Sequence, residues 1–320
     1  MRHIGVVVGE ARSLYRNAMN DQRDAPLLGT DWLTIVVVVF FWAAFTSLLL
    51  WRHHLPTAAV VAGLAVLGGL YMSLQHEVIH GHPTPWRWLN RLLVGAPLGM
   101  TQPFDRYRDT HLAHHEADLT NPLDDPESYY VTPQAWESAR GAHRMVLRVN
   151  RTLAGRLTIG PVLALARTVS SDLRLMRSRR DVWRAWLLHL MAVGLLVVVL
   201  RALAMPLWIY MVGFVAGGAS LTALRSFVEH RAADGEPRSA IVRSGWFFSF
   251  IFLNNNLHYT HHLLPGASWF RLPELSRSIN AEAAVADGAG CYRGYREVAR
   301  RFMFRPFGQP AYPLSATIEA

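Results

Sequence analysis

Lysine is absent from this 320-residue chain, and cysteine occurs once, at Cys291. A single cysteine excludes an internal disulfide and any zinc or iron–sulfur site built from several thiolates. All 32 basic side chains are therefore arginines, a usage typical of a GC-rich genome. Acidic residues are also few, at 23.

Long apolar runs are abundant, with hydrophobic residues making up 51% of the chain. A helix needs about 20 apolar residues to cross a bilayer. Such runs predict four transmembrane helices, at about 32–51, 56–74, 185–204 and 206–225. The first starts too far from Met1 to be a signal peptide, so we expect a retained anchor. Residues 89–100 are apolar but too short to span, which predicts an interfacial or re-entrant segment.

The spacing of these runs predicts an all-α, polytopic membrane protein with two hairpins of spans and a helical cap. We expect one domain over residues 1–320, because no repeat or linker divides the chain. Eleven arginines fall between Arg140 and Arg184, in the stretch between the second and third spans. By the positive-inside tendency this stretch is cytoplasmic, and so are both termini. We therefore attribute the basic charge to membrane topology and to contact with lipid head groups, and not to nucleic-acid binding. The predicted location is a bacterial inner membrane.

Histidines are concentrated in three motifs next to the spans. The first is H-x-x-x-H, and two copies of H-x-x-H-H follow later in the chain; the residues are His76 and His80, then His111, His114 and His115, then His258, His261 and His262. On a helix, positions i, i+3 and i+4 lie on one face, so each motif offers its imidazoles to the same small volume. Imidazole suits zinc, copper, iron and nickel.

An even number of crossings separates the three motifs, so they face the same side of the membrane and can form one site. Eight histidines exceed the four ligands of a usual zinc site, which favours two ions. His230, at the start of the polar segment after the fourth span, is a ninth candidate ligand. Nitrogen donors with few carboxylates indicate a redox metal more than a hydrolytic one.

These motifs and their order resemble those of the integral-membrane fatty acid desaturase superfamily, and the pair Glu229-His230 resembles an additional histidine of that family. The resemblance implies a di-iron centre on the cytoplasmic face that uses O2 to oxidise a lipid or acyl substrate. The chain has no His-Pro-Gly-Gly haem motif. Electrons are therefore expected from a separate ferredoxin, rubredoxin or cytochrome.

Several residues beside the motifs are expected to orient imidazoles: Glu77, Glu229, Asn254 and Asn255. Asp124, Asp125 and Glu127 are expected to brace the loop after the second motif. His82 is a possible extra ligand, although on a continuous helix it would point about 200° away from His80.

Three alternatives stay open at this point. A di-iron hydroxylase or ketolase of a lipid, alkane or carotenoid would have the same histidine spacing as a desaturase. An intramembrane zinc metalloprotease would use His76, Glu77 and His80, which spell H-E-x-x-H, with Glu77 as general base. It leaves the other motif histidines unexplained. A membrane haem or metal carrier would place its histidines within the spans, whereas these lie outside the apolar runs.

Overall fold

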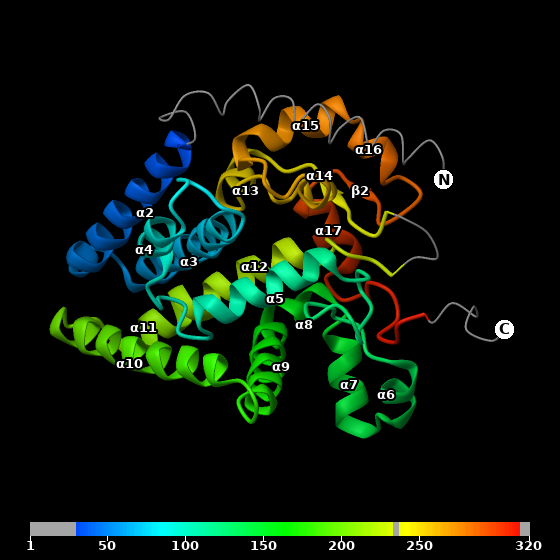
Figure 1. Ribbon diagram of the computed structural model, residues 1–320, viewed down its shortest axis with the longest axis horizontal. Coiled ribbons are helices and arrows are strands. Elements are labelled where there is room, and N and C mark those ends of the chain that lie inside the picture. The colour runs from blue at the N-terminus through cyan, green and yellow to red at the C-terminus, as the bar shows by residue number, and fades with distance from the viewer. Residues whose placement is uncertain (1–29, 233–236, 314–320) are drawn as a thin grey trace.

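The computed structural model describes residues 30–232 and 237–313, which are mostly helical (Figure 1). The helices are α2 (Trp32–Trp51), α3 (Thr57–Ile79), α4 (Arg87–Val94), α5 (Phe104–Glu116), α6 (Pro133–Ser138), α7 (Gly141–Val149), α8 (Leu153–Thr158), α9 (Gly160–Leu175), α10 (Arg180–Ala202), α11 (Leu207–Tyr210), α12 (Gly218–Ser226), α13 (Trp246–Ile251), α14 (His258–Leu263), α15 (Leu272–Ser278), α16 (Ala281–Ala284) and α17 (Tyr295–Phe302). Short turns η1 (Arg52–His54) and η3 (Trp269–Arg271) and the π-helical η2 (Met211–Gly217) complete them. Within these residues, the two-residue strands β1 (Ile241–Val242) and β2 (Cys291–Tyr292) pair in parallel, a small departure from an all-α chain.

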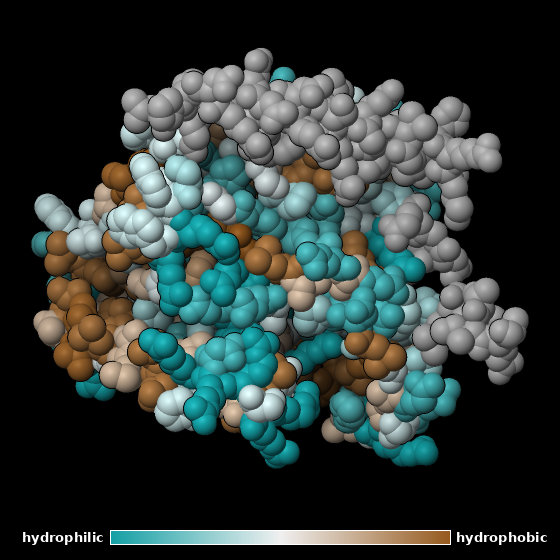
Figure 2. Space-filling view, in the orientation of Figure 1, coloured by the Kyte–Doolittle hydropathy of each residue, from teal (hydrophilic) through white to brown (hydrophobic). Residues whose placement is uncertain are grey.

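Four helical segments are long and apolar enough to cross a membrane: Trp32–His54, Thr57–Ile79, Arg180–Ala202 and Leu207–Ser226. They match the four predicted spans, and the first three are each three or four residues longer than predicted. In Figure 2 hydrophobic side chains gather at the left-hand end of the molecule, where α2 and α10 lie in Figure 1. The predicted cytoplasmic termini lie outside the described residues.

The second and fourth spans touch backbone to backbone. A Cβ atom built on Gly68 of α3 would lie 2.4 Å from the carbonyl oxygen of Phe214 and 2.9 Å from the Cα of Gly218. Small residues allow such close approach of helices in membranes, where packing replaces the hydrophobic drive. The contact fixes α3, which carries the first histidine motif, against α12, which leads to His230.

The last turn of α4 and the non-helical segment after it are held by side chains from all four spans. Five side chains donate hydrogen bonds to their backbone carbonyls: Trp42 to Leu93 (2.9 Å), Tyr71 to Val94 and Ala96 (2.6 and 2.5 Å), Gln75 to Val94 (2.9 Å), His189 to Met100 (3.3 Å) and Tyr210 to Leu98 (2.8 Å). Irregular backbone is tolerated at membrane depth only where its polar groups are satisfied in this way. The arrangement supports the re-entrant interpretation of residues 89–100 and sets the starting point of α5.

A buried ion pair then fixes the direction of α5. Arg106 donates from Nε and Nη2 to both carboxylate oxygens of Asp172 on α9, at 2.8 to 3.1 Å. Trp186 of α10 donates to the same carboxylate at 2.8 Å. Because a charged pair in this geometry is directional, it orients the helix that carries the second histidine motif.

Replacing Tyr71 with Phe tests the role of these carbonyl contacts. The substitution removes one of the hydrogen bonds accepted by each of the Val94 and Ala96 carbonyls, which keep those from Gln75 and from the Leu98 N–H. At about 0.5–1.5 kcal/mol for each lost hydrogen bond, we expect a loss of about 1–3 kcal/mol of stability. Thermal unfolding in detergent should show a lower midpoint for Tyr71→Phe and little change for Trp208→Phe, which replaces an exposed side chain on α11. Equal midpoints for the two variants would contradict the assignment.

Candidate metal centre

The nine histidines predicted as ligands converge on one region of the molecule. α3 and the residue after it supply His76 and His80, and α5 supplies His111, His114 and His115. His230 follows α12, and α14 supplies His258, His261 and His262. All nine are buried or half-buried. The structure therefore brings together the three motifs and the isolated histidine from segments far apart in the sequence.

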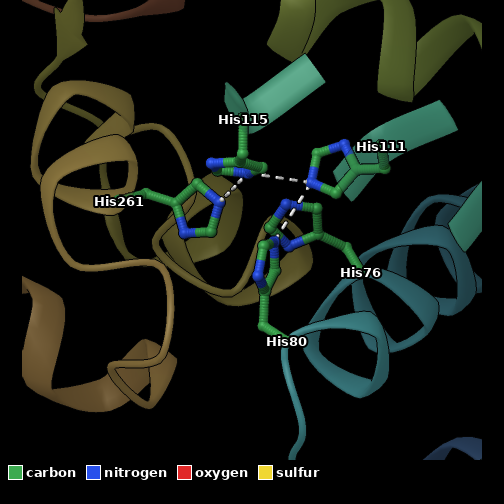
Figure 3. A group of neighbouring side chains, drawn as sticks. All are labelled: His76, His80, His111, His115 and His261. Carbon is green, nitrogen blue, oxygen red and sulfur yellow. Dashed lines mark hydrogen bonds between the residues drawn. The ribbon is translucent and has the colours of Figure 1, made fainter. Parts of the chain in front are cut away.

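These histidines form two groups that meet the geometric requirements of a metal site. The first metal group is His76, His80, His111, His115 and His261; the second metal group is His114, His230, His258 and His262. Within each group the potential ligand atoms lie within 4.8 Å of one another. Figure 3 shows the five imidazoles of the first group pointing toward one another.

Each H-x-x-H-H motif is divided between the two groups. The i and i+4 histidines stay together, as His111 with His115 and His258 with His262, whereas His114 and His261 join the opposite group. Successive residues turn by 100°, so i+4 lies about 40° from i, and i+3 lies about 60° away on the other side. The sequence predicts that all imidazoles of a motif face the same small volume. In the structure each H-x-x-H-H motif instead supplies histidines to two adjacent metal groups.

The ring nitrogens within each group are evenly spaced. Successive Nε2 atoms lie 3.1 to 3.2 Å apart from His80 through His111 and His115 to His261. In the second group they lie 2.9 to 3.1 Å apart, from His114 through His230 and His258 to His262. Nitrogens about 2.1 Å from a metal would be about 3.4 Å apart in a tetrahedron and about 3.0 Å apart at right angles. The spacing fits ring nitrogens that share one metal ion within each group.

Neighbouring side chains set which ring nitrogen faces inward. Asp125 Oδ1 lies 2.7 Å from His114 Nδ1, and Glu127 Oε1 lies 3.1 Å from His111 Nδ1. A carboxylate accepts only, so Nδ1 carries the proton and the lone pair on Nε2 points into the group. Such lone pairs 3 Å apart repel one another unless a cation lies between them. The residues therefore fit a metal ion in each group.

Burial also keeps five of the imidazoles neutral. Burial, reinforced by the neighbouring imidazoles, lowers the pKa of His80 to about 2 and that of His115 to about 3. The same causes, burial first, hold the pKa values of His258, His261 and His262 well below the usual value. Neutral imidazole is the form that binds metal, so no proton has to leave these rings before an ion binds.

Asp125 and Glu127 are orienting residues that the sequence indicated only in part. The structure bears out the brace, because Asp125 accepts from the backbone N–H groups of Thr120 and Glu127 at 2.9 and 2.8 Å. Its contact with His114 goes beyond that prediction. The available signal is a pair of carboxylates ten and twelve residues after His115, in a loop short enough to fold back on α5.

Two of the four residues predicted to orient imidazoles lie beside imidazole nitrogens, Asn255 and Glu229. Asn255 lies 3.3 Å from His76 Nε2 and 3.1 Å from His258 Nδ1, so one amide touches both groups. Glu229 Oε1 lies 3.4 Å from His258 Nδ1 and 3.0 Å from the guanidinium of Arg225.

Glu77 and Asn254 contact a backbone segment instead of an imidazole. Among the described residues their hydrogen bonds go to the backbone of Trp269: Glu77 accepts from its N–H at 3.3 Å, and Asn254 donates to its carbonyl at 3.0 Å. Both side chains therefore secure the loop after α14 and do not orient an imidazole.

His82 lies outside both metal groups. α3 ends at Ile79, so the chain turns away before His82 and the angle expected for a continuous helix does not apply. Its Nε2 donates to the carbonyl of Gly266 at 3.2 Å, and its Nδ1 lies 3.4 Å from Ser268 Oγ and 3.7 Å from Asp31. The possible extra ligand thus joins the loop after α14 to the start of α2.

Four apolar helices and two sets of inward-facing imidazoles define a histidine-rich, metal-binding membrane protein. The profile of the family described as fatty acid desaturase matches residues 50–292, which is most of the chain. The protein belongs to the fatty acid desaturase family. A comparison with individual curated proteins gives no significant match.

The neighbours Asp124 and Asp125 offer a matched test of the orienting contact. Asp125 is buried against His114, whereas Asp124 accepts from the backbone N–H of exposed Asp118. Replacing Asp125 with Asn should weaken metal binding about 10- to 100-fold, the usual effect of losing such a partner. Metal retained after dialysis against a chelator series measures this. Asp124→Asn is the control, and equal retention by both variants would rule out the orienting role.

Proposed function

We propose that the chain is a membrane-bound, O2-dependent di-iron oxidoreductase that introduces a double bond into an acyl chain. Its family membership and its two histidine groups support this proposal. The observation that carries it is the pair of adjacent all-nitrogen ligand sets, one of them with five imidazoles. More than four nitrogen donors around one ion suit a redox metal such as iron better than structural or catalytic zinc.

The bound irons would supply the oxidising power to remove hydrogen from an unactivated C–H bond, with O2 as co-substrate. The residues of the chain fix the ligand atoms and exclude water from the centre. Asp125 and Glu127 hold the protons of His114 and His111 on Nδ1, so that the ligand atoms stay fixed. Burial of the centre excludes water, which strengthens electrostatic interactions and limits side reactions. Correct placement of the acyl chain then decides which carbon is oxidised.

The zinc protease alternative fits these contacts poorly. A general base must reach a water on the metal, but Glu77 accepts a hydrogen bond from the backbone N–H of Trp269. His76 and His80 also belong to a group of five imidazoles, which leaves little room for the water that catalytic zinc keeps.

We further propose how the chain around this centre is arranged in the membrane and where its electrons come from. The four spans form two hairpins, and the remaining helices form a cytoplasmic cap within one domain over residues 1–320. The location is a bacterial inner membrane, with both termini cytoplasmic. Electrons come from a ferredoxin, a rubredoxin or a cytochrome, because the chain has no haem motif of its own.

Expression of the chain in a bacterial host with a known lipid composition tests the proposed reaction. We expect new unsaturation in acyl chains only when O2 is supplied, measured by mass spectrometry of extracted lipids. His262→Ala should abolish it, since His262 belongs to the second metal group, whereas His143→Ala on exposed α7 should not. A zinc protease using His76, Glu77 and His80 would tolerate the loss of His262.

Two outcomes would change the proposal. A hydroxylated or keto product with unchanged unsaturation would replace desaturation with hydroxylation or ketolation at the same centre. Oxidation that persists in the His262→Ala variant would reject the second metal group altogether.

A further inference from the structure

A pocket of about 370 Å³ lies between α4, α5 and α10. Four arginines and three aspartates line it, together with Ala185 and Leu188 of α10. None of the nine ligand histidines is among the lining residues. The pocket is therefore a site separate from the metal centre, and its charges indicate a charged ligand.

The charges in and beside this pocket form ion pairs, with one exception. The pairs, with N–O distances of 2.5 to 2.8 Å, are Arg91–Asp105, Arg108–Asp109, Arg106–Asp172 and Arg179–Asp181. Arg184 is the exception, because it makes no hydrogen bond or ion pair with any other residue that the structure describes. Five arginines thus face four aspartates, which leaves one unpaired positive charge at the pocket.

The pocket lies at the level of lipid head groups. Arg184 is in the second turn of the apolar helix α10, and its neighbour Trp183 is 55% exposed. On another wall, Trp88 of α4 is 68% exposed, one turn before Arg91. Exposed tryptophans at the ends of apolar helices mark the boundary between head groups and hydrocarbon. An anion bound by Arg184 would therefore lie where lipid phosphates lie.

The wall formed by α10 becomes apolar beyond Arg184. Leu188 lines the pocket one helical turn later, about 6 Å further along the helix, and is 50% exposed. Leu187 and Met191 continue the exposed apolar surface of α10. A ligand that fits both parts carries one negative charge in its head group and has apolar chains beyond it.

We propose that this pocket binds one anionic phospholipid, with its phosphodiester paired to Arg184 and its acyl chains lying along Leu188. Basic pockets between membrane helices bind anionic head groups through the same pairing. A zwitterionic head group fits less well, because all four aspartates are already paired and none is left for an ammonium. The lipid is a resident ligand and not the molecule that is oxidised, since no ligand histidine lines its site.

Such a lipid would join the most sparsely packed part of the fold to the rest. Of the 23 residues of α10, Val182, His189 and Leu200 are buried. The walls of the pocket come from α4, α5 and α10, so a lipid in it links α10 to the helix that carries the second histidine motif. A ligand that binds only the folded state raises stability by mass action. We therefore expect anionic phospholipid to stabilise the protein.

The test compares Arg184→Gln with Arg180→Gln in the purified full chain. Both arginines lie at the start of α10, and both are exposed and unpaired among the described residues, but Arg180 does not line the pocket. Each substitution removes one positive charge, so non-specific attraction to anionic lipid should fall equally. Native mass spectrometry in detergent measures the binding of phosphatidylglycerol and phosphatidylcholine with the same acyl chains, and thermal unfolding is followed with each lipid.

We expect one phosphatidylglycerol to bind each chain and phosphatidylcholine to bind at least about tenfold more weakly, because only the first matches the unpaired charge. Arg184→Gln should weaken phosphatidylglycerol binding at least about tenfold, since a charge-assisted hydrogen bond is lost. Arg180→Gln should change it much less. The rise in unfolding midpoint that phosphatidylglycerol produces should disappear in Arg184→Gln and persist in Arg180→Gln.

Equal losses of affinity in the two variants would refute the site, because they would reflect general charge attraction. Equal affinity for the two lipids would refute the anionic specificity and with it the proposal. Displacement of the lipid by millimolar inorganic phosphate would replace the proposal with a site for a free anion. These measurements need neither metal nor turnover, so their outcome is independent of the proposed function.

Discussion

The structure depends on one electrostatic constraint: nine imidazoles are buried or half-buried, and neighbouring ring nitrogens within each metal group lie about 3 Å apart. Where Asp125 and Glu127 hold the proton on Nδ1, the Nε2 lone pairs of His114 and His111 face the ring nitrogens of their own groups. A cation at each centre would remove the repulsion between such lone pairs. We therefore expect metal binding to be coupled to the packing of the segments that carry these histidines, as it is in proteins whose sites do not exist in the unfolded chain.

The surrounding fold positions the four separate segments that carry these histidines. Glycine contacts hold α3 and α12 together, so that His76 can join the first metal group and His230 the adjacent second group. The carbonyls of residues 93–100 accept hydrogen bonds from side chains of every span and position the start of α5, and the Arg106–Asp172 pair determines its direction.

Much of this architecture is readable from the sequence because its signals are local. Apolar length gives the four spans, and helical spacing within each motif gives the histidine ligands. The 100° turn per residue indicates that the i+3 and i+4 histidines of an H-x-x-H-H motif point in different directions. Whether they join different metal groups depends on the relative placement of three helices, which the spacing does not give. The contacts of Asp125 and Glu127 with imidazoles depend on how the loop after α5 folds back. The contacts of Glu77 and Asn254 with Trp269 depend on how the segment after α14 packs against them. No local pattern encodes those contacts.

The central claim is that the two histidine groups each hold an iron ion. Elemental analysis of the purified protein, with iron, zinc, copper and manganese measured against protein concentration, tests it most directly. The account predicts about two irons per chain, falling by about half when His230 of the second group is replaced with Ala while the protein stays folded. One zinc per chain with no iron, unchanged in the His230→Ala variant, would contradict it.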